Sequence, residues 1–187
     1  YFVDRVIPML PEVLSNGICS LNAGEDRYAM TCMMEIDTHG KVVNYRIQPS
    51  IIHVNHRCSY KEIYKALTED IIPDDLAPLM PMIHNLSDIA KTLNNMRRRR
   101  GALDFDFPEY KVLLDTEGTP LRIVRRDRTL AERLIEECML IANETVATHL
   151  KNTNRTSVYR IHETPSEEKM SMYQKVLNYL GQAIRLH

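Results

Sequence analysis

Two β-prone stretches separated by only three residues place the strongest constraint on how this sequence can fold. They cover residues 28–37 and 41–54, and Thr38-His39-Gly40 lies between them. A connection this short joins antiparallel strands, and Gly40 can adopt the positive φ that a tight turn requires. The sequence therefore predicts a β-hairpin here.

Further strands are predicted later in the chain. Residues 110–114 and 121–125 flank Asp-Thr-Glu-Gly at 115–118, which is typical of a second hairpin turn. Residues 103–107 alternate apolar and acidic side chains, the pattern of a strand with one apolar and one charged face. We also expect a short strand around residues 158–161.

Two helices are predicted between the hairpins. Ser59 and Glu62 have the Ser-x-x-Glu spacing of a capping box, in which each side chain bonds to the other residue's backbone N–H. Tyr60 then takes the first helical position, where a side chain is usually reachable from solvent. The second helix is expected over residues 82–100, and Gly101 suits its C-terminal cap.

Two more helices are predicted after the second hairpin. Thr129 and Glu132 form another capping box, which opens a helix extending to about residue 150. A third box is expected at residues 164–167, where Pro165 takes the first helical position of a final helix that runs to the end of the chain. Hairpins mixed with helices predict an α+β fold.

The composition is that of one soluble globular domain. The 187 residues are 44% apolar and 26% charged. No apolar run approaches the roughly 20 residues needed to cross a bilayer, and no signal peptide is evident, so we expect a cytoplasmic protein with no membrane partner. The four cysteines lack Cys-x-x-Cys spacing and are expected to be reduced and mostly buried.

Glu136 is the carboxylate with the most unusual predicted setting. Met139 and Leu140 bring apolar character toward its side of the helix, so this side is expected to be partly covered. An unpaired buried charge is costly, and Glu136 therefore needs either a structural ion pair or a ligand hydroxyl as its partner. The opposite face of the helix carries Leu134, Cys138, Ile141 and Thr145.

Four consecutive arginines, residues 97–100, form the densest positive patch in a chain of net charge -1. They can interact favourably with the helix C-terminus, or they can bind a phosphate backbone. Four successive side chains on a helix cannot all face one groove, which favours the first interpretation.

Three sets of residues offer potential metal ligands. They are Asp104 with Asp106, Asp74 with Asp75, and His53 with His56. None has a diagnostic spacing, and a solvated strand face or loop explains each of them without a metal.

Several strings, in order and spread over nearly the whole chain, resemble the catalytic RNB domain of the ribonuclease II family, and its ribonuclease R branch in particular. They are VIPMLPE (6–12), LSNGICSLN (14–22), GALDFD (101–106), AERLIEE (131–137), ANE (142–144) and YRIHE (159–163). The resemblance implies a Mg²⁺-dependent 3′-to-5′ exoribonuclease that hydrolyses single-stranded and structured RNA to nucleoside 5′-monophosphates.

The resemblance also implies roles in RNA binding for four residues. Tyr1 and Phe105 match the aromatic pair that clamps the terminal nucleotide, and Tyr60 matches a tyrosine that contacts the terminal ribose. Glu136 matches a glutamate near the sugar, where contact with the 2′-hydroxyl distinguishes RNA from DNA.

Two parts of the family's catalytic site have no match here. The chain begins at Tyr1 without a methionine, and the aspartates that hold the metal precede this point in the family. A segment like Ser-Pro-Ile-Arg-Arg-Tyr, which supplies an arginine to the transition state, follows the point that matches His187. We therefore expect residues 1–187 to be a partial RNB domain that contains no catalytic or metal-binding residue of the parent enzyme and is inactive alone.

A second hypothesis is a non-catalytic RNA-binding or scaffold protein that keeps the fold without the metal site. The presence of the aspartate cluster in the full-length protein would support the exoribonuclease, and its absence would support the non-catalytic protein. Without the rest of the parent domain, residues 1–187 would expose apolar surface that is covered in the whole protein. We therefore expect this part alone to self-associate. Cys138 stands where the family usually has phenylalanine, a change that a protein core can absorb.

Overall fold

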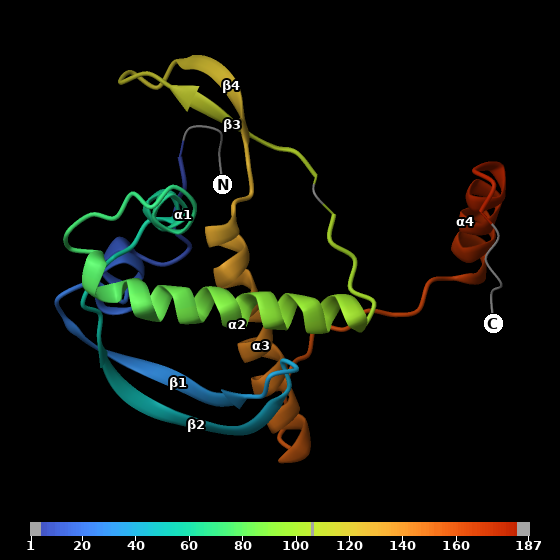
Figure 1. The fold of residues 1–187 in the computed structure, drawn as a ribbon, viewed down its shortest axis with the longest axis horizontal. Helices are drawn as coiled ribbons and strands as arrows, with labels where there is room; N and C mark the ends of the chain where they lie inside the picture. Colours follow the sequence, from blue (N-terminus) through green and yellow to red (C-terminus); the bar gives the residue numbers. More distant parts are fainter. Residues whose placement is uncertain (1–4, 106, 183–187) are drawn as a thin grey trace. The chain divides into compact units, whose positions relative to one another are not determined.

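The computed structural model describes residues 5–105 and 107–182, which form two compact units dividing between His149 and Leu150. The first unit holds two antiparallel hairpins, helices α1 and α2, and most of α3, and the second holds α4 (Figure 1). The predicted α+β fold is confirmed.

The first hairpin pairs β1 (Asp26–Ile36) with β2 (Val42–His53). Its turn is built around Asp37, whose Oδ1 accepts hydrogen bonds from the backbone N–H groups of His39 and Lys41 at 2.9 and 2.8 Å. Gly40 has φ +87°, and a Cβ atom there would lie 3.0 Å from Cβ of Met96 on α2. Glycine is therefore required both by the turn and by its contact with α2.

The second hairpin pairs β3 (Glu109–Leu114) with β4 (Pro120–Arg126) and repeats the design of the first turn. Here Oδ1 of Asp115 accepts from the N–H groups of Glu117 and Thr119 at 2.9 and 2.8 Å. In both turns a short acidic side chain satisfies backbone donors that the strands leave unpaired.

Helices α1 (Tyr60–Thr68) and α2 (Met80–Arg99) lie between the hairpins in sequence, and a short 3₁₀ turn (Ala77–Leu79) precedes α2. The capping box of Ser59 and Glu62 is present in both directions. Helix α2 begins two residues before its predicted start, because Pro81 fits the first turn, where a missing N–H costs nothing.

Helices α3 (Leu130–Asn152) and α4 (Glu167–Tyr179) follow the second hairpin. The Thr129 N–H donates to Glu132 Oε2 at 3.0 Å, as the second capping box predicts. The third box was placed wrongly, since α4 is capped by Ser166, whose side chain accepts from the Lys169 N–H. Pro165 therefore precedes the cap. Near the start of the chain, residues Val13–Ile18 form one short π-helical turn.

The core of the first unit lies along α2. Ala66, Leu76, Met80 and Ile83 form one buried cluster, and Leu93 is buried further along the same helix. The first hairpin contacts both long helices: Arg99 donates to the His39 carbonyl at 3.3 Å, and the ring of Tyr45 meets that of His149 edge-on at 5.7 Å. These contacts fix α2, α3 and the hairpin relative to one another.

Two predicted strands are not observed. Residues 103–105 and 107–108 are irregular, and so are residues 158–161. An alternating pattern makes a strand only where a neighbouring strand can accept its hydrogen bonds, and the described residues provide none beside either segment.

The cysteines are less buried than the sequence predicted. All four cysteines are free, but Cys19 and Cys58 are exposed and Cys32 and Cys138 are only partly buried, so the prediction of mostly buried thiols was wrong. Burial raises the pKa of the Cys138 thiol.

Within the described part of the chain, no helix is long and apolar enough to cross a bilayer.

Candidate functional site

An aromatic and basic pocket lies where the irregular segment after α2 meets the end of β4. It has a volume of about 310 Å³, and its lining combines aromatic, basic and acidic side chains: Phe105, Phe107, Pro108, Glu109, Arg125, Arg126, Asp127 and Arg128. The two phenylalanine rings are stacked, with centroids 5.5 Å apart and planes 15° from parallel. They are 64% and 76% exposed, so neither is the core residue that an apolar position on a strand would be.

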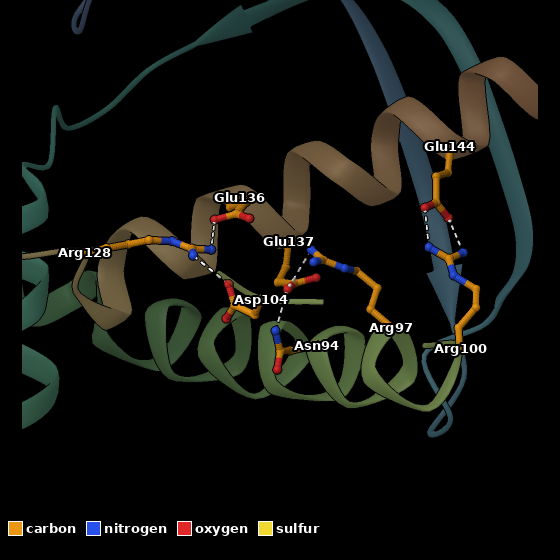
Figure 2. Close-up of polar contacts among 8 residues, drawn as sticks. All are labelled: Asn94, Arg97, Arg100, Asp104, Arg128, Glu136, Glu137 and Glu144. Atoms are coloured by element: carbon orange, nitrogen blue, oxygen red, sulfur yellow. Dashed lines mark hydrogen bonds and ion pairs between the residues drawn. The ribbon is translucent and has the colours of Figure 1, made fainter. Parts of the chain in front are cut away.

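Arg128 joins this pocket to α3. Its Nη1 donates to Oδ1 of Asp104 at 2.8 Å, and its Nη2 donates to Oε2 of Glu136 in a short contact (Figure 2). Asp104 directly precedes Phe105, so one guanidinium connects the segment that carries the aromatic rings with the second turn of α3.

The charges at this junction stabilise one another. The hydrogen bond from Arg128 lowers the pKa of the Asp104 carboxyl, and the same bond raises the pKa of the Arg128 guanidinium. Both groups are therefore charged at neutral pH. One guanidinium here contacts two carboxylates, so Arg128 links Asp104 and Glu136 directly.

Glu136 has the protein partner that its position called for, and it is partly buried, as predicted. Its side chain is 38% exposed, and Met139 next to it in the helix is exposed as well. Oε2 is bonded to Arg128, whereas Oε1 accepts no hydrogen bond from the residues that the structure describes. The ion pair and a ligand contact are therefore compatible, because each can use a different oxygen of the carboxylate.

The deeply buried carboxylate is Glu137, which the sequence analysis did not single out. Its side chain is 5% exposed, and Oε1 accepts from Asn94 Nδ2 at 2.8 Å and from Arg97 Nη1 at 3.1 Å (Figure 2). Its other oxygen, Oε2, is buried without a partner among the described residues. Glu137 lies on the predicted buried face, one turn after Leu134 and one before Ile141, and this spacing was the signal available in the sequence.

The arginine cluster is divided among several partners. Arg97 binds Glu137, Arg99 contacts backbone carbonyls, and Arg100 forms a two-pronged pair with Glu144 at 2.7 and 3.0 Å. The bond from Arg100 lowers the pKa of Glu144. The expectation that the four side chains cannot face one groove is confirmed, and two of them instead join α2 to α3.

The two tyrosines have different outcomes. Tyr60 is the first residue of α1 and is 44% exposed, as its capping box predicts. Tyr1 lies outside the described residues. The roles in RNA binding of Tyr1, Tyr60, Phe105 and Glu136 stay predictions.

The described residues do not fit a metal site. They contain no group of three or more His, Cys, Asp or Glu side chains arranged to hold an ion. Asp104 is bonded to Arg128, His53 to Asp26, and His56 lies 3.8 Å from Asp75, while Asp106 falls outside the described residues. No chemical step is therefore assigned to a metal held by these residues.

Taken together, the pocket offers three chemical properties suited to a nucleotide. Exposed aromatic faces can stack with a base of any sequence. Arginine side chains can bind phosphate oxygens. Glu136, which Arg128 joins to the pocket, has one carboxylate oxygen with no donor among the described residues, and this oxygen can accept a hydrogen bond from a hydroxyl group.

Comparisons with known proteins identify what the chain is similar to. The profile of the RNB domain family matches residues 1–186. Ribonuclease R from Thermotoga maritima is 42% identical over 182 residues, which cover 97% of this chain and 26% of that protein. The chain spans about a quarter of the length of the curated relatives it matches.

Solved structures give the same result for the fold. Mycoplasma genitalium RNase R in complex with ribose methylated single-stranded RNA matches with a TM-score of 0.90 and 29% identity, over 98% of this chain and 29% of that one. Yeast Ssd1, a pseudonuclease, matches with a TM-score of 0.68 and 16% identity, over 97% of this chain and 22% of its own. The second likeness concerns the fold alone.

Proposed function

The chain belongs to the RNB domain family, and we propose that it forms part of the RNA channel of a ribonuclease R-like 3′-to-5′ exoribonuclease. Its parent protein would hydrolyse single-stranded and structured RNA from the 3′ end and release nucleoside 5′-monophosphates. The observation that carries this proposal is the exposed Phe105 ring in an arginine-lined pocket, tied through Arg128 to Glu136.

Phe105 is proposed to stack with a base near the 3′ end. Its exposure supports this role because a base can reach the ring, and the three arginines beside it, each paired with carboxylates, carry N–H groups that can also donate to a phosphate. Stacking on an aromatic ring contributes about 1–3 kcal/mol per base and is insensitive to sequence. This property suits an enzyme that must degrade any RNA.

Glu136 is proposed to accept a hydrogen bond from the 2′-hydroxyl of a ribose. Its Oε1 has no donor among the described residues and its side chain is partly exposed, so a hydroxyl can reach it. The 2′-hydroxyl is the group through which a protein distinguishes RNA from DNA. Tyr60, exposed at the start of α1, is proposed to contact the terminal ribose, and Tyr1 to complete the clamp on the last base.

Mg²⁺ is proposed to act in the parent enzyme through ligands that this chain does not supply, since the described residues do not fit a metal site. The chain covers about a quarter of its relatives' length, which leaves most of a parent protein to provide such ligands and the transition-state arginine. We therefore propose that residues 1–187 do not cleave RNA on their own.

The proposal is tested with the full-length protein and 5′-labelled poly(A) in Mg²⁺. We expect stepwise shortening from the 3′ end and release of AMP, with no cleavage by residues 1–187 alone. If the full-length sequence lacks an aspartate cluster and the protein binds but does not shorten poly(A), the nuclease proposal fails. The alternative, an RNA-binding or scaffold protein with an RNB-like fold, then replaces it.

A second test concerns Glu136 directly. In the full-length protein, Glu136→Ala is expected to reduce the preference for a ribose over a deoxyribose 3′ end by about tenfold to a hundredfold, because a hydrogen bond to a charged group contributes about 1.5–3 kcal/mol. The measurement is the ratio of kcat/KM for two oligonucleotides that differ only in their terminal sugars. An unchanged ratio would remove Glu136 from this role.

A further inference from the structure

We propose that Arg128 is a positioning residue that sets the preference for RNA over DNA by holding the Glu136 carboxylate at a fixed place relative to the Phe105 ring. This inference rests on the function proposed above for Glu136 and Phe105. It goes beyond that function because Arg128 itself is given no contact with the nucleic acid.

The first support is the geometry of the guanidinium. Arg128 lies between the end of β4 at Arg126 and the start of α3 at Leu130, and its two terminal nitrogens bond to two different carboxylates. A guanidinium is planar and rigid, so oxygens bound to its two arms are held at a fixed separation. Asp104 and Glu136 are therefore fixed relative to each other through one side chain.

The second support is the way in which the segment that carries Phe105 is attached to the rest of the unit. Residues 102–105 and 107–108 have no regular secondary structure, and the N–H of Ala102 donates to the Arg97 carbonyl at 3.0 Å. Among its described residues, Asp104 makes the side-chain hydrogen bond that ties it to another part of the unit. The position of the neighbouring Phe105 ring is therefore expected to depend on Arg128.

The third support is that Arg128 binds only one of the two oxygens of the Glu136 carboxylate. It occupies Oε2, while Oε1 stays without a donor from the described residues. A carboxylate held by one oxygen loses less conformational entropy when its other oxygen binds a hydroxyl, because its rotamer is already fixed.

The other two arginines of the pocket do not provide the same link. Arg125 lies 3.2 Å from Asp127, and Arg126 lies 3.9 Å from both Glu109 and Glu132. Of the three arginines that line the pocket, Arg128 is the one bonded to Glu136 within the described part of the chain. A base stacked on Phe105 and the sugar at Glu136 would be recognised together only if this link is intact.

The test uses Arg128→Lys in the full-length protein. Lysine keeps the charge but is a single-point donor that cannot reproduce the planar fork. We expect the ratio of kcat/KM for ribose and deoxyribose 3′ ends to fall by about tenfold, the size of one misplaced charged hydrogen bond. The matched control is Arg100→Lys, which weakens another arginine–glutamate pair on α3 and should leave the ratio unchanged.

A double variant separates positioning from a merely structural role. If Arg128 acts through Glu136, adding Arg128→Lys to Glu136→Ala causes no further loss of the ratio. If instead Glu136→Ala lowers the ratio and Arg128→Lys alone does not, the role of Arg128 is overturned while that of Glu136 stands. A ratio that does not respond to Glu136→Ala would overturn the proposed function itself.

Asp104→Asn carries the test if the lysine variant folds poorly, since it weakens one arm of the link and leaves α3 intact. It is expected to lower the ratio in the same direction by several-fold, with thermal melting used to confirm that the protein is folded. A folded Asp104→Asn protein with the wild-type ratio would overturn the proposal.

Discussion

Replacing Glu137 with alanine is expected to lower the free energy of unfolding by about 3–5 kcal/mol, because it removes one partner of a buried ion pair and leaves the other charged. The Glu137 side chain is 5% exposed and that of Arg97 is 16% exposed. Asn94 would lose its hydrogen bond in the same step. The measurement is urea unfolding followed by circular dichroism, with Glu137→Ala compared with the unmodified protein.

The control is Glu144→Ala on the same helix. Glu144 also pairs with an arginine of α2, but the two side chains are 45% and 54% exposed, and an exposed pair contributes at most about 1 kcal/mol. Equal losses from the two substitutions would contradict the view that burial, and not the number of hydrogen bonds, makes the Glu137 pair important.

Replacing Leu93 with alanine is expected to cost about 2–5 kcal/mol, the range for removing a large buried apolar side chain. Leu93 is 1% exposed, and it lines the same small cavity between α2 and α3 as Leu140 and Ile141. The substitution would enlarge this cavity, and the cost depends on how far the surrounding side chains move to fill it. Urea unfolding measures this loss as well.

Leu103→Ala provides the comparison, because it makes the same chemical change at a side chain that is 75% exposed. Its expected cost is below about 0.5 kcal/mol, as for other surface substitutions. Similar costs at the two positions would mean that Leu93 does not pack in the interior of the unit.

Both large effects concern the contact between α2 and α3, and this contact also positions the candidate site. Successive residues of a helix are about 100° apart around its axis, so fixing Glu137 against α2 turns Glu136 toward Arg128 and the pocket. Loss of the buried Glu137 pair is therefore expected to disturb Glu136 without touching it, whereas the exposed Arg100–Glu144 pair contributes too little to do so.

Local chemistry in the sequence was sufficient to predict those elements whose turns and caps satisfy their own backbone groups. The turn at Gly40, the turn at residues 115–118 and the capping box at Ser59 each satisfy their own backbone groups within a few residues. For this reason the two hairpins, the exposed first position of Tyr60 and the starts of α1 and α3 were predicted correctly. The third capping box failed because Ser166 and Thr164 are both good cap residues, and local spacing did not decide between them.

What the sequence could not provide was the choice among partners that are distant along the chain. The alternation at residues 103–107 predicted a strand, but the described part of the chain offers no neighbouring strand there, and Asp104 pairs with Arg128 instead. The sequence singled out Glu136, which is partly buried, and not the adjacent Glu137, which the packing of α2 buries almost completely. Local patterns fix which backbone groups are satisfied nearby, whereas the burial of a charge depends on which element packs against it, and only the tertiary structure decides that.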